Sequence, residues 1–204
     1  MKQVNKSHYE FLKYMDKRRW NSVWHQIDEV IRLNPVSVLE IGPGSGVFKN
    51  TACLFGLKVE TIDLDPDLMP DHVGSATALP FDDKAFDAVC AFQMLEHLPY
   101  EEALSAFREM ARVSRRDIVI SVPDSKAVWR YLFQVPRLGD FKFLLPNPFV
   151  APRVHEFDGE HYWEVGTKNF PLEKVISDFS AIRPLANTYR VHDNPYHRFF
   201  IFKS

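Results

Sequence analysis

Three glycines recur at every second position directly after a short apolar segment, at Gly42, Gly44 and Gly46. The preceding segment, residues 38–41, reads Val-Leu-Glu-Ile and is typical of a strand buried in a parallel sheet. Glycine has no Cβ to obstruct a close approach, and it adopts backbone angles that are closed to other residues. The pattern therefore predicts a turn at the end of a strand that passes very close to a bound ligand.

A further acid ends the next apolar segment. Asp63 follows residues 59–62 and lies 21 positions after Gly42, where a carboxylate can accept hydrogen bonds from both hydroxyl groups of a ribose. The spacing is not that of the dinucleotide fingerprint, because Val47 occupies the position of its third glycine. The helix start also lacks a Lys followed by Ser or Thr, which excludes a phosphate-binding P-loop. The loop and the acid together indicate a nucleoside-binding α/β domain.

Residues 40–46, Glu-x-Gly-x-Gly-x-Gly, resemble the first motif of class I S-adenosylmethionine-dependent methyltransferases, in particular the small type 11-like members. Four further blocks continue the resemblance in the family's order over residues 36–123. They are residues 63–67 (Asp-Leu-Asp-Pro-Asp), 74–81 (Gly-Ser-Ala-Thr-Ala-Leu-Pro-Phe), 86–89 (Phe-Asp-Ala-Val) and 94–98 (Met-Leu-Glu-His-Leu). The resemblance implies an α/β, Rossmann-like fold: a seven-stranded, mostly parallel sheet with an antiparallel last strand and helices on both faces. It also implies a methyl-transferring enzyme with S-adenosyl-L-methionine as its cofactor.

The resemblance also assigns roles around that cofactor. Glu40 would bind the methionine amino group, generally through water, and the backbone of the glycine loop would hold the methionine end. Asp63 would bind the ribose, and the residues around Gln93 would flank the cofactor. The alternatives are a carboxylate that braces the loop at Glu40 and an exposed turn acid at Asp63. The residues expected at the cofactor site are Glu40, Gly42, Pro43, Gly44, Gly46, Asp63, Leu64, Ser75, Ala76, Gln93 and Glu96.

One position departs from the family's pattern. The residue after Gly74 is usually an Asp that accepts a hydrogen bond from the adenine amino group, and this chain has Ser75 there. A serine hydroxyl also accepts a hydrogen bond, but it is shorter and uncharged. The backbone at Ala76 and packing against Leu64 are other ways to hold the adenine. We expect weaker binding rather than its loss; a non-catalytic module that binds S-adenosylmethionine is the alternative.

Candidate catalytic side chains are few, because a sulfonium is already an activated methyl donor and the protein mainly has to align the acceptor with it. His97 follows the fourth expected strand on the cofactor side. Its ordinary pKa of about 6.5 suits a general base. The alternative is that His97 only shapes the turn into the next helix.

A polar cluster, residues 155–164, contains two histidines and four acids. His155 and His161 are further candidates for catalysis. They lie six residues apart with a glycine between them, which does not match a helical zinc pair, so no metal is expected. The cluster is interpreted as a polar loop that faces the substrate, or as a structural loop. Tyr162 and Trp163 would suit the wall of an aromatic pocket or stacking on a cationic substrate.

Composition and charge limit the class of protein. The chain of 204 residues fits one domain, and a formal net charge of −2 without runs of like charge gives no nucleic-acid footprint. The first residues lack the apolar core of a signal peptide, and no apolar stretch approaches the length of a membrane span. We expect Cys53 and Cys90 to be reduced core thiols and the protein to be cytoplasmic.

Four parts are expected along this single methyltransferase domain. They are a helical leader (1–35), the cofactor-binding core (36–123), a substrate-side insertion or lid (124–170), and a C-terminal helix and hairpin (171–204). In the leader, a helix over 7–32 places Tyr9 or Trp20 against the cofactor or, as the simpler interpretation, in the core. Expected strands cover 36–41, 57–62, residue 73, 86–92, 117–122, 181–191 and 197–203, the last two joined by residues 193–196. Expected helix boundaries are a stop near Gly56 and starts at Pro66, Pro99 and Pro171.

The leading functional interpretation is a methyltransferase for a small molecule, with a cavity roofed by residues 127–165. A protein or RNA methyltransferase is the alternative, but the Asn/Asp-Pro-Pro-aromatic motif of many such enzymes is absent, since residues 93–96 read Gln-Met-Leu-Glu. Peripheral contact with a membrane, or a lipophilic substrate, is a further interpretation of an apolar and basic group in the insertion. This group is Arg137, Phe141, Lys142, Phe143, Leu144 and Leu145.

Overall fold

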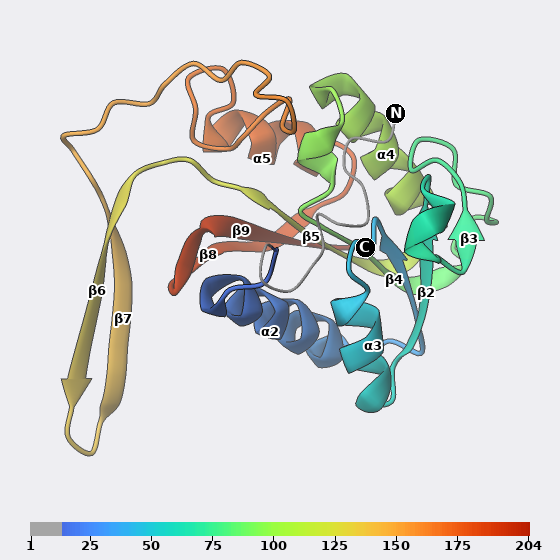
Figure 1. Cartoon of the computed structure of the whole chain (residues 1–204), viewed down its shortest axis with the longest axis horizontal. Coiled ribbons are helices and arrows are strands. Elements are labelled where there is room, and N and C mark those ends of the chain that lie inside the picture. Colours follow the sequence, from blue (N-terminus) through green and yellow to red (C-terminus); the bar gives the residue numbers. More distant parts are fainter. Residues whose placement is uncertain (1–13) are drawn as a thin grey trace.

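The computed structural model describes residues 14–204. A seven-stranded sheet in the order β3-β2-β1-β4-β5-β9-β8 forms its centre (Figure 1). The strands are β1 (Ser37–Ile41), β2 (Lys58–Asp63), β3 (His72–Val73), β4 (Phe86–Phe92), β5 (Ser114–Pro123), β8 (Leu185–Val191) and β9 (Asn194–Lys203). The first five are parallel, whereas β9 runs antiparallel between β5 and β8. The expected fold class, with the last strand antiparallel beside the fifth, is confirmed.

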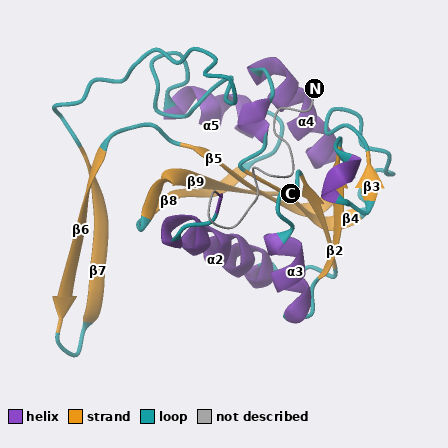
Figure 2. Cartoon of the chain, viewed as in Figure 1, coloured by secondary structure: helices purple, strands orange, loops and turns teal. Residues whose placement is uncertain are grey.

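Helices cover both faces of this sheet (Figure 2). On one face lie α2 (Lys17–Arg32) and α3 (Val47–Leu54), and on the other α4 (Tyr100–Val113) and α5 (Leu172–Ser180). Short 3-10 turns, η2 (Pro66–Leu68) and η3 (Leu95–His97), follow β2 and β4. Within residues 14–204, no helix is both long and apolar enough to cross a membrane.

Strand β9 joins the two apolar layers because its side chains alternate between the faces of the sheet. Phe199 and Ile201 pack in the cluster beneath α2 and α3, and Phe200 and Phe202 pack in the cluster beneath α4 and α5. All four side chains are buried. The sheet is therefore a two-sided core whose carboxyl edge is left for the loops.

Several boundaries agree closely with the sequence. The apolar run 86–92 is β4, α3 stops just before Gly56, which has a φ of +89°, and the helix starts at Pro66, Pro99 and Pro171 are confirmed. The connection between β8 and β9 is shorter than expected, because Val191 already pairs with Asn194. Cys90 is buried as expected, whereas Cys53 is exposed, so the expectation of a core thiol at Cys53 is wrong.

Within the described residues the expected leader helix is interrupted, because Tyr14 is helical and residues 15 and 16 are not. In the described residues α2 starts at Lys17, because the Asp16 side chain accepts a hydrogen bond from the backbone of Arg19 at 2.7 Å and caps the helix. Its buried face contains Val23, Gln26 and Val30, so Trp20 points outward and is 50% exposed. Core packing of Trp20 is therefore wrong. Tyr9 and the rest of the expected helix over residues 7–13 lie outside the described residues.

The insertion forms an antiparallel hairpin of β6 (Val128–Val135) and β7 (Gly139–Pro146), which the sequence did not predict. It projects from the body of the molecule (Figure 1), with Tyr131, Phe133 and Phe143 stacked along it. The base of this hairpin, at Val128, Leu144 and Pro146, lines a cavity, and the expected roof over residues 127–165 stays a prediction. Several apolar side chains of the hairpin are exposed, and contact with a membrane stays a prediction.

Candidate functional site

A small cavity of about 50 Å³ lies at the carboxyl end of β1 and contains five of the expected cofactor residues. These are Glu40, Gly42, Pro43, Gly44 and Gln93. The other lining residues are Tyr14, Met15, Arg19, Val23, Gln26, Ser45, Val47, Phe48, Phe92 and His197. The structure thus brings the glycine loop, the end of β4, the leader and β9 around one point at the sheet edge where α/β proteins bind ligands.

The glycine loop needs its glycines. Gly42 and Gly44 have φ angles of +70° and +52°, and Gly46, with φ of +69°, precedes the first residue of α3. A Cβ on Gly42 would lie 2.5 Å from Cγ of Met94, which is far inside van der Waals contact. Gln93 also has a positive φ, +53°, and its amide hydrogen-bonds the backbone of Ser121 at 2.8 Å. Backbone strain of this kind concentrates at functional sites.

Glu40 is buried against the loop, with 3% of its surface exposed. Its Oε2 has no hydrogen-bond partner among the residues that the structure describes. Burial raises the pKa of Glu40 to about 8, and the nearby charge of Lys49 offsets only part of this. The carboxyl group is therefore short of a positive partner, which a ligand ammonium group would provide.

Asp63 and Leu64 lie at the end of β2, beside β1 but outside the lining of the small cavity. Asp63 accepts a hydrogen bond from the backbone of Asp65 at 2.8 Å, and burial raises its pKa. Its backbone carbonyl also accepts from the amide of Gly74 at 3.0 Å, which places the next residue of interest beside it. Leu64 is exposed, which leaves its side chain accessible to an incoming group.

The hydroxyl of Ser75 is engaged within its own turn. It lies 2.9 Å from the hydroxyl of Thr77 and accepts a hydrogen bond from the Thr77 backbone at 3.2 Å. Such local bonds of serine compete with bonds to other partners. The turn continues through Ala76, whose side chain packs partly buried against the larger core. Neither residue lines the small cavity.

Glu96 lies in η3, three residues after Gln93, and is completely buried. Neither carboxyl oxygen has a hydrogen-bond partner within residues 14–204. Burial raises the pKa of Glu96 to about 8, and the charge of His161 opposes this. The sequence predicted Glu96 at the cofactor site, but it did not predict that the side chain is buried.

The structure brings His97 and His161 together. Their ring centres are 5.1 Å apart. Nδ1 of His97 hydrogen-bonds the carbonyl oxygen of Glu160 at 3.0 Å, and Nδ1 of His161 hydrogen-bonds Oε1 of Glu164 at 3.0 Å. Burial lowers the pKa of His161, but the bond to Glu164 and the charge of Glu96 raise it more, so the net shift is upward.

His155 differs from these two histidines because it is buried and its hydrogen bonds hold two parts of its loop together. Its Nε2 hydrogen-bonds the carbonyl oxygen of His161 at 3.1 Å. Its backbone exchanges two hydrogen bonds with the side chain of Asn169, both at 2.9 Å. This arrangement favours the structural alternative for His155.

Trp163 is part of the core, so its expected place in a pocket wall is wrong. Its side chain is fully buried, with Tyr100 and Phe170 packed against the ring. Tyr162 is partly exposed and stacks on Phe157 with ring centres 4.3 Å apart. The burial of Trp163 could not be predicted from the sequence, because a loop lacks the regular spacing of buried residues that helices and strands have.

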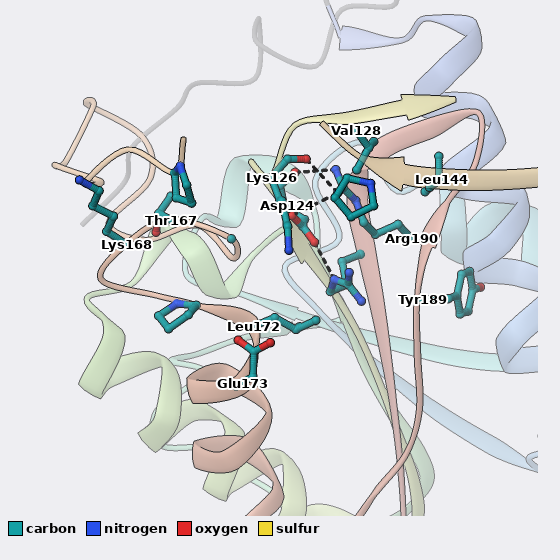
Figure 3. A pocket seen from close by; sticks show the side chains of 15 residues that line it. Asp124, Lys126, Val128, Leu144, Thr167, Lys168, Leu172, Glu173, Tyr189 and Arg190 are labelled. Carbon is teal, nitrogen blue, oxygen red and sulfur yellow. Dashed lines mark hydrogen bonds and ion pairs between the residues drawn. The ribbon is translucent and has the colours of Figure 1, made fainter. Parts of the chain in front are cut away.

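A larger cavity of about 430 Å³ opens at the base of the hairpin (Figure 3). Val128 and Leu144 border it from the hairpin, and Leu172 and Glu173 border it from the start of α5. Its charged floor is Asp124, which pairs with Arg198 at 2.7 Å and with Arg190 at 3.6 Å. Lys126, Thr167 and Lys168 also line it (Figure 3). Its size is that of a pocket for a small molecule.

Several lining residues of the small cavity were not predicted from the sequence. Tyr14 and Arg19 come from the leader and His197 comes from β9, both distant in sequence from the glycine loop. His197 is buried, and burial together with the charge of Arg19 lowers its pKa to about 3. These residues belong to no local sequence motif, because only the tertiary fold brings them next to the glycine loop.

Comparison with known proteins agrees with this geometry. Residues 39–121 match the family model described as "Methyltransferase domain". This segment contains the glycine loop, Asp63, Ser75 and Glu96. No curated protein sequence is significantly similar to the chain.

Similar solved structures cover nearly the whole chain at low sequence identity. The PH0226 protein from Pyrococcus horikoshii has a TM-score of 0.65 at 15% identity, covering 98% of this chain and 99% of that one. The 1,6-didemethyltoxoflavin-N1-methyltransferase from Burkholderia thailandensis has 0.62 at 14% identity, covering 97% and 84%. Magnesium protoporphyrin IX methyltransferase from Synechocystis has 0.59 at 15% identity, covering 91% and 83%. At these identities the likeness establishes the fold.

Proposed function

We propose, on the premise that residues 39–121 form a methyltransferase domain, that this chain transfers the methyl group of S-adenosyl-L-methionine to a small-molecule acceptor. The observation that carries the proposal is the glycine-loop cavity, whose wall contains the buried carboxyl group of Glu40 with no hydrogen-bond partner for Oε2 among the described residues. The glycine loop lets the backbone come close to a ligand. A buried carboxyl group beside this loop can pair with the ammonium group of a methionine moiety.

The other cofactor contacts follow from the sheet edge. Asp63 lies at the end of the neighbouring strand and would accept hydrogen bonds from the ribose hydroxyl groups. Because the Ser75 hydroxyl already bonds Thr77, the backbone at Ala76 and the exposed side chain of Leu64 would hold the adenine. Gln93 and Glu96 would flank the cofactor from the end of β4.

The reaction is an in-line displacement. A lone pair of the acceptor forms the new bond to the methyl carbon, the bond from carbon to sulfur breaks, and sulfur keeps the electron pair as a thioether. Alignment of acceptor and donor supplies about 7–11 kcal/mol. Where the acceptor holds its proton tightly, His97 or His161 would take it as a general base, adding roughly 10²–10⁴-fold.

The larger cavity is the proposed acceptor site. It opens after β5, which is parallel to β1 and β4, so it lies at the same edge of the sheet as the glycine loop. Two of the similar structures are methyltransferases for small molecules, 1,6-didemethyltoxoflavin and magnesium protoporphyrin IX. A cavity of this size, lined by apolar side chains and by charged ones of both signs, fits the same class of acceptor.

A thermal-shift titration tests the cofactor site. S-adenosylmethionine at a hundredfold excess over its dissociation constant stabilises by about 2.7 kcal/mol. For a chain of this length we expect a rise in Tm on the order of 5–10 °C. The rise should disappear in Asp63→Ala and persist in the control Asp82→Ala, an exposed acid on another loop. A cooperative melt without any shift in the wild type would reject the proposal.

Cavity filling tests the acceptor site. With a methyl acceptor found by screening metabolite extracts, Leu144→Trp should abolish turnover while the thermal shift with S-adenosylmethionine stays intact. Leu132→Trp is the matched control, because Leu132 is exposed on the same hairpin and does not line the cavity. Equal turnover in both variants would place the acceptor elsewhere.

A further inference from the structure

The carboxyl group of Glu96 is the most conspicuous unsatisfied group near the proposed active site. It is 0% exposed, and neither of its oxygens finds a hydrogen-bond partner among residues 14–204. Burial of a carboxyl group without a partner is costly, and such groups are rare in folded proteins. The position is typical of a carboxylate that has a cation as its partner.

Two imidazole rings accompany this carboxyl group. Glu96, His97 and His161 each present one ligand atom, and these atoms all lie within 4.8 Å of one another. The residues come from two segments, η3 and the loop 155–164. A hydrogen bond of 2.9 Å from the backbone of Tyr162 to the carbonyl oxygen of Glu96 holds the two segments together.

The surroundings of both histidines resemble those of metal ligands. A histidine that binds a metal generally donates its other ring N–H to a carbonyl or carboxylate oxygen, which fixes the ring. Nδ1 of His97 has the carbonyl of Glu160 as its partner, and Nδ1 of His161 has Oε1 of Glu164. Glu164 is itself held by the hydroxyl of Tyr196 at 2.5 Å. The rings are therefore oriented before any ion binds.

The neighbouring acids already have other partners. Asp158 accepts hydrogen bonds from the backbone of Glu160 at 3.0 Å and of His161 at 2.7 Å. Glu164 accepts from His161 and Tyr196, as described above. Of the three carboxyl groups placed with these histidines, those of Glu96, Asp158 and Glu164, the one left for a ligand is thus that of Glu96. His155, whose spacing from His161 argued against a helical zinc pair, is not a member of the set.

We propose that Glu96, His97 and His161 bind one divalent transition-metal ion, for which Zn²⁺ is the representative. Two imidazole nitrogens and one carboxylate oxygen are a ligand set of catalytic zinc sites, in which a fourth position stays open. Nitrogen ligands favour such an ion over Mg²⁺, which prefers oxygen.

The ion would lie close to the cofactor cavity. Tyr14 and Arg19 line that cavity, and Glu96 acts on the pKa of Tyr14 while Arg19 acts on that of Glu96 through their charges. The open position would take an oxygen atom of the acceptor and lower its pKa, so that with the ion bound His97 and His161 would act as ligands and not as the general base. This role rests on the proposed function, whereas binding of the ion does not.

Metal binding can be measured on the chain of 204 residues without any acceptor. After treatment with a chelator, the protein is titrated with Zn²⁺ against a chromophoric competitor, and with Co²⁺ to record the visible absorption of a coordinated ion. We expect one ion per chain. Glu96→Gln keeps the side-chain volume and should weaken Zn²⁺ binding by more than the 10–100-fold that is typical when an outer partner of a ligand is lost. His161→Asn should do the same.

The matched control is Glu60→Gln. Glu60 also pairs with a histidine, His72, at 2.7 Å, but on the outer strands of the sheet, and this variant should bind Zn²⁺ as the wild type does. No stoichiometric binding in the wild type, or equal binding in the wild type and both ligand variants, would overturn the proposal. Failure of the cofactor thermal shift would instead reject the proposed function, so the two failures are distinguishable.

Discussion

The indole nitrogen of Trp163 donates a hydrogen bond of 3.2 Å to the carbonyl oxygen of Leu95, across 68 residues of sequence. Together with the bond from the Tyr162 backbone to Glu96, it fixes the loop 155–164 onto η3. The position of His161 relative to Glu96 therefore depends on a residue that touches neither the proposed cofactor nor the proposed ion.

Two substitutions of Trp163 separate the contribution of its hydrogen bond from that of its packing. Trp163→Phe keeps most of the packing and loses the hydrogen bond, so we expect a loss of about 1 kcal/mol in the free energy of unfolding. Trp163→Ala also leaves a cavity and should cost about 3–5 kcal/mol. Urea unfolding measures both values. A similar, small loss in both variants would mean that the indole does not anchor the loop.

Glu40 predicts a pH dependence of stability in the absence of cofactor. Its folded pKa is raised from 4.5 to about 8, so the folded state holds a proton that the unfolded state releases in this range. Stability is then complete below about pH 4.5 and falls, by a few kcal/mol, as pH rises through 8. The charge of Lys49 opposes this shift, and burial together with the charge of Glu40 raises the pKa of Cys90; both residues are unchanged in a Glu40 variant.

Glu40→Gln removes this ionisation. The variant should be more stable than the wild type at pH 8–9, equal to it near pH 4, and much weaker in binding S-adenosylmethionine. Thermal melts over this pH range, with and without cofactor, provide the measurement. Parallel pH profiles of the two proteins would contradict the assignment of a neutral carboxyl group.

His197 predicts the opposite slope. Burial and the charge of Arg19 lower its folded pKa to about 3, and the charge of Asp16 opposes this. Between about pH 6.5 and pH 3 the unfolded state therefore binds a proton that the folded state does not bind. Stability is complete above about pH 6.5 and falls as pH drops towards 3. His197→Gln should flatten this acid limb. A melt series from pH 7 to pH 4 that is equally steep in the variant would refute the prediction.

Gly42 and Gly56 form a matched pair for the glycine loop. Both have positive φ, but a Cβ would meet Met94 at 2.5 Å on Gly42 and nothing within 4 Å on Gly56. Gly56→Ala should cost only the backbone strain, about 1–2 kcal/mol. Gly42→Ala should cost about 1–3 kcal/mol more, through overpacking, and should lose cofactor binding. Chemical unfolding and the cofactor thermal shift measure the two effects, and equal costs would contradict the close approach.

The sequence predicted those parts of the fold that local patterns control. The apolar run of β4 and the proline at the start of α4 set boundaries directly, and the spacing of glycines predicted the turn with positive φ angles after β1. The hairpin was missed because its prolines, Pro136 and Pro146, lie at the turn and at the last residue of β7, where they break nothing.

Long-range burial explains the remaining differences. Trp20 and Trp163 have similar hydrophobicity, yet one is half exposed and the other fully buried, because α2 presents a different face to the sheet and the loop folds back onto η3. The same reason hid Arg19 and His197 from a reading along the chain. The roles of Ser75 and His97 stay predictions, as does that of His161, which the Zn²⁺ titration of His161→Asn tests.

The hairpin of β6 and β7 closes on itself at its base, since the backbone of Asn147 donates a hydrogen bond of 2.9 Å to the carbonyl oxygen of Ala127. Its two ends therefore meet, and none of the seven strands of the main sheet pairs with it. A ribbon attached in this way can be lengthened, shortened or exchanged without moving the glycine loop. If the larger cavity takes the acceptor, as proposed, selection can change the choice of acceptor through this hairpin independently of the residues proposed to bind the methyl donor.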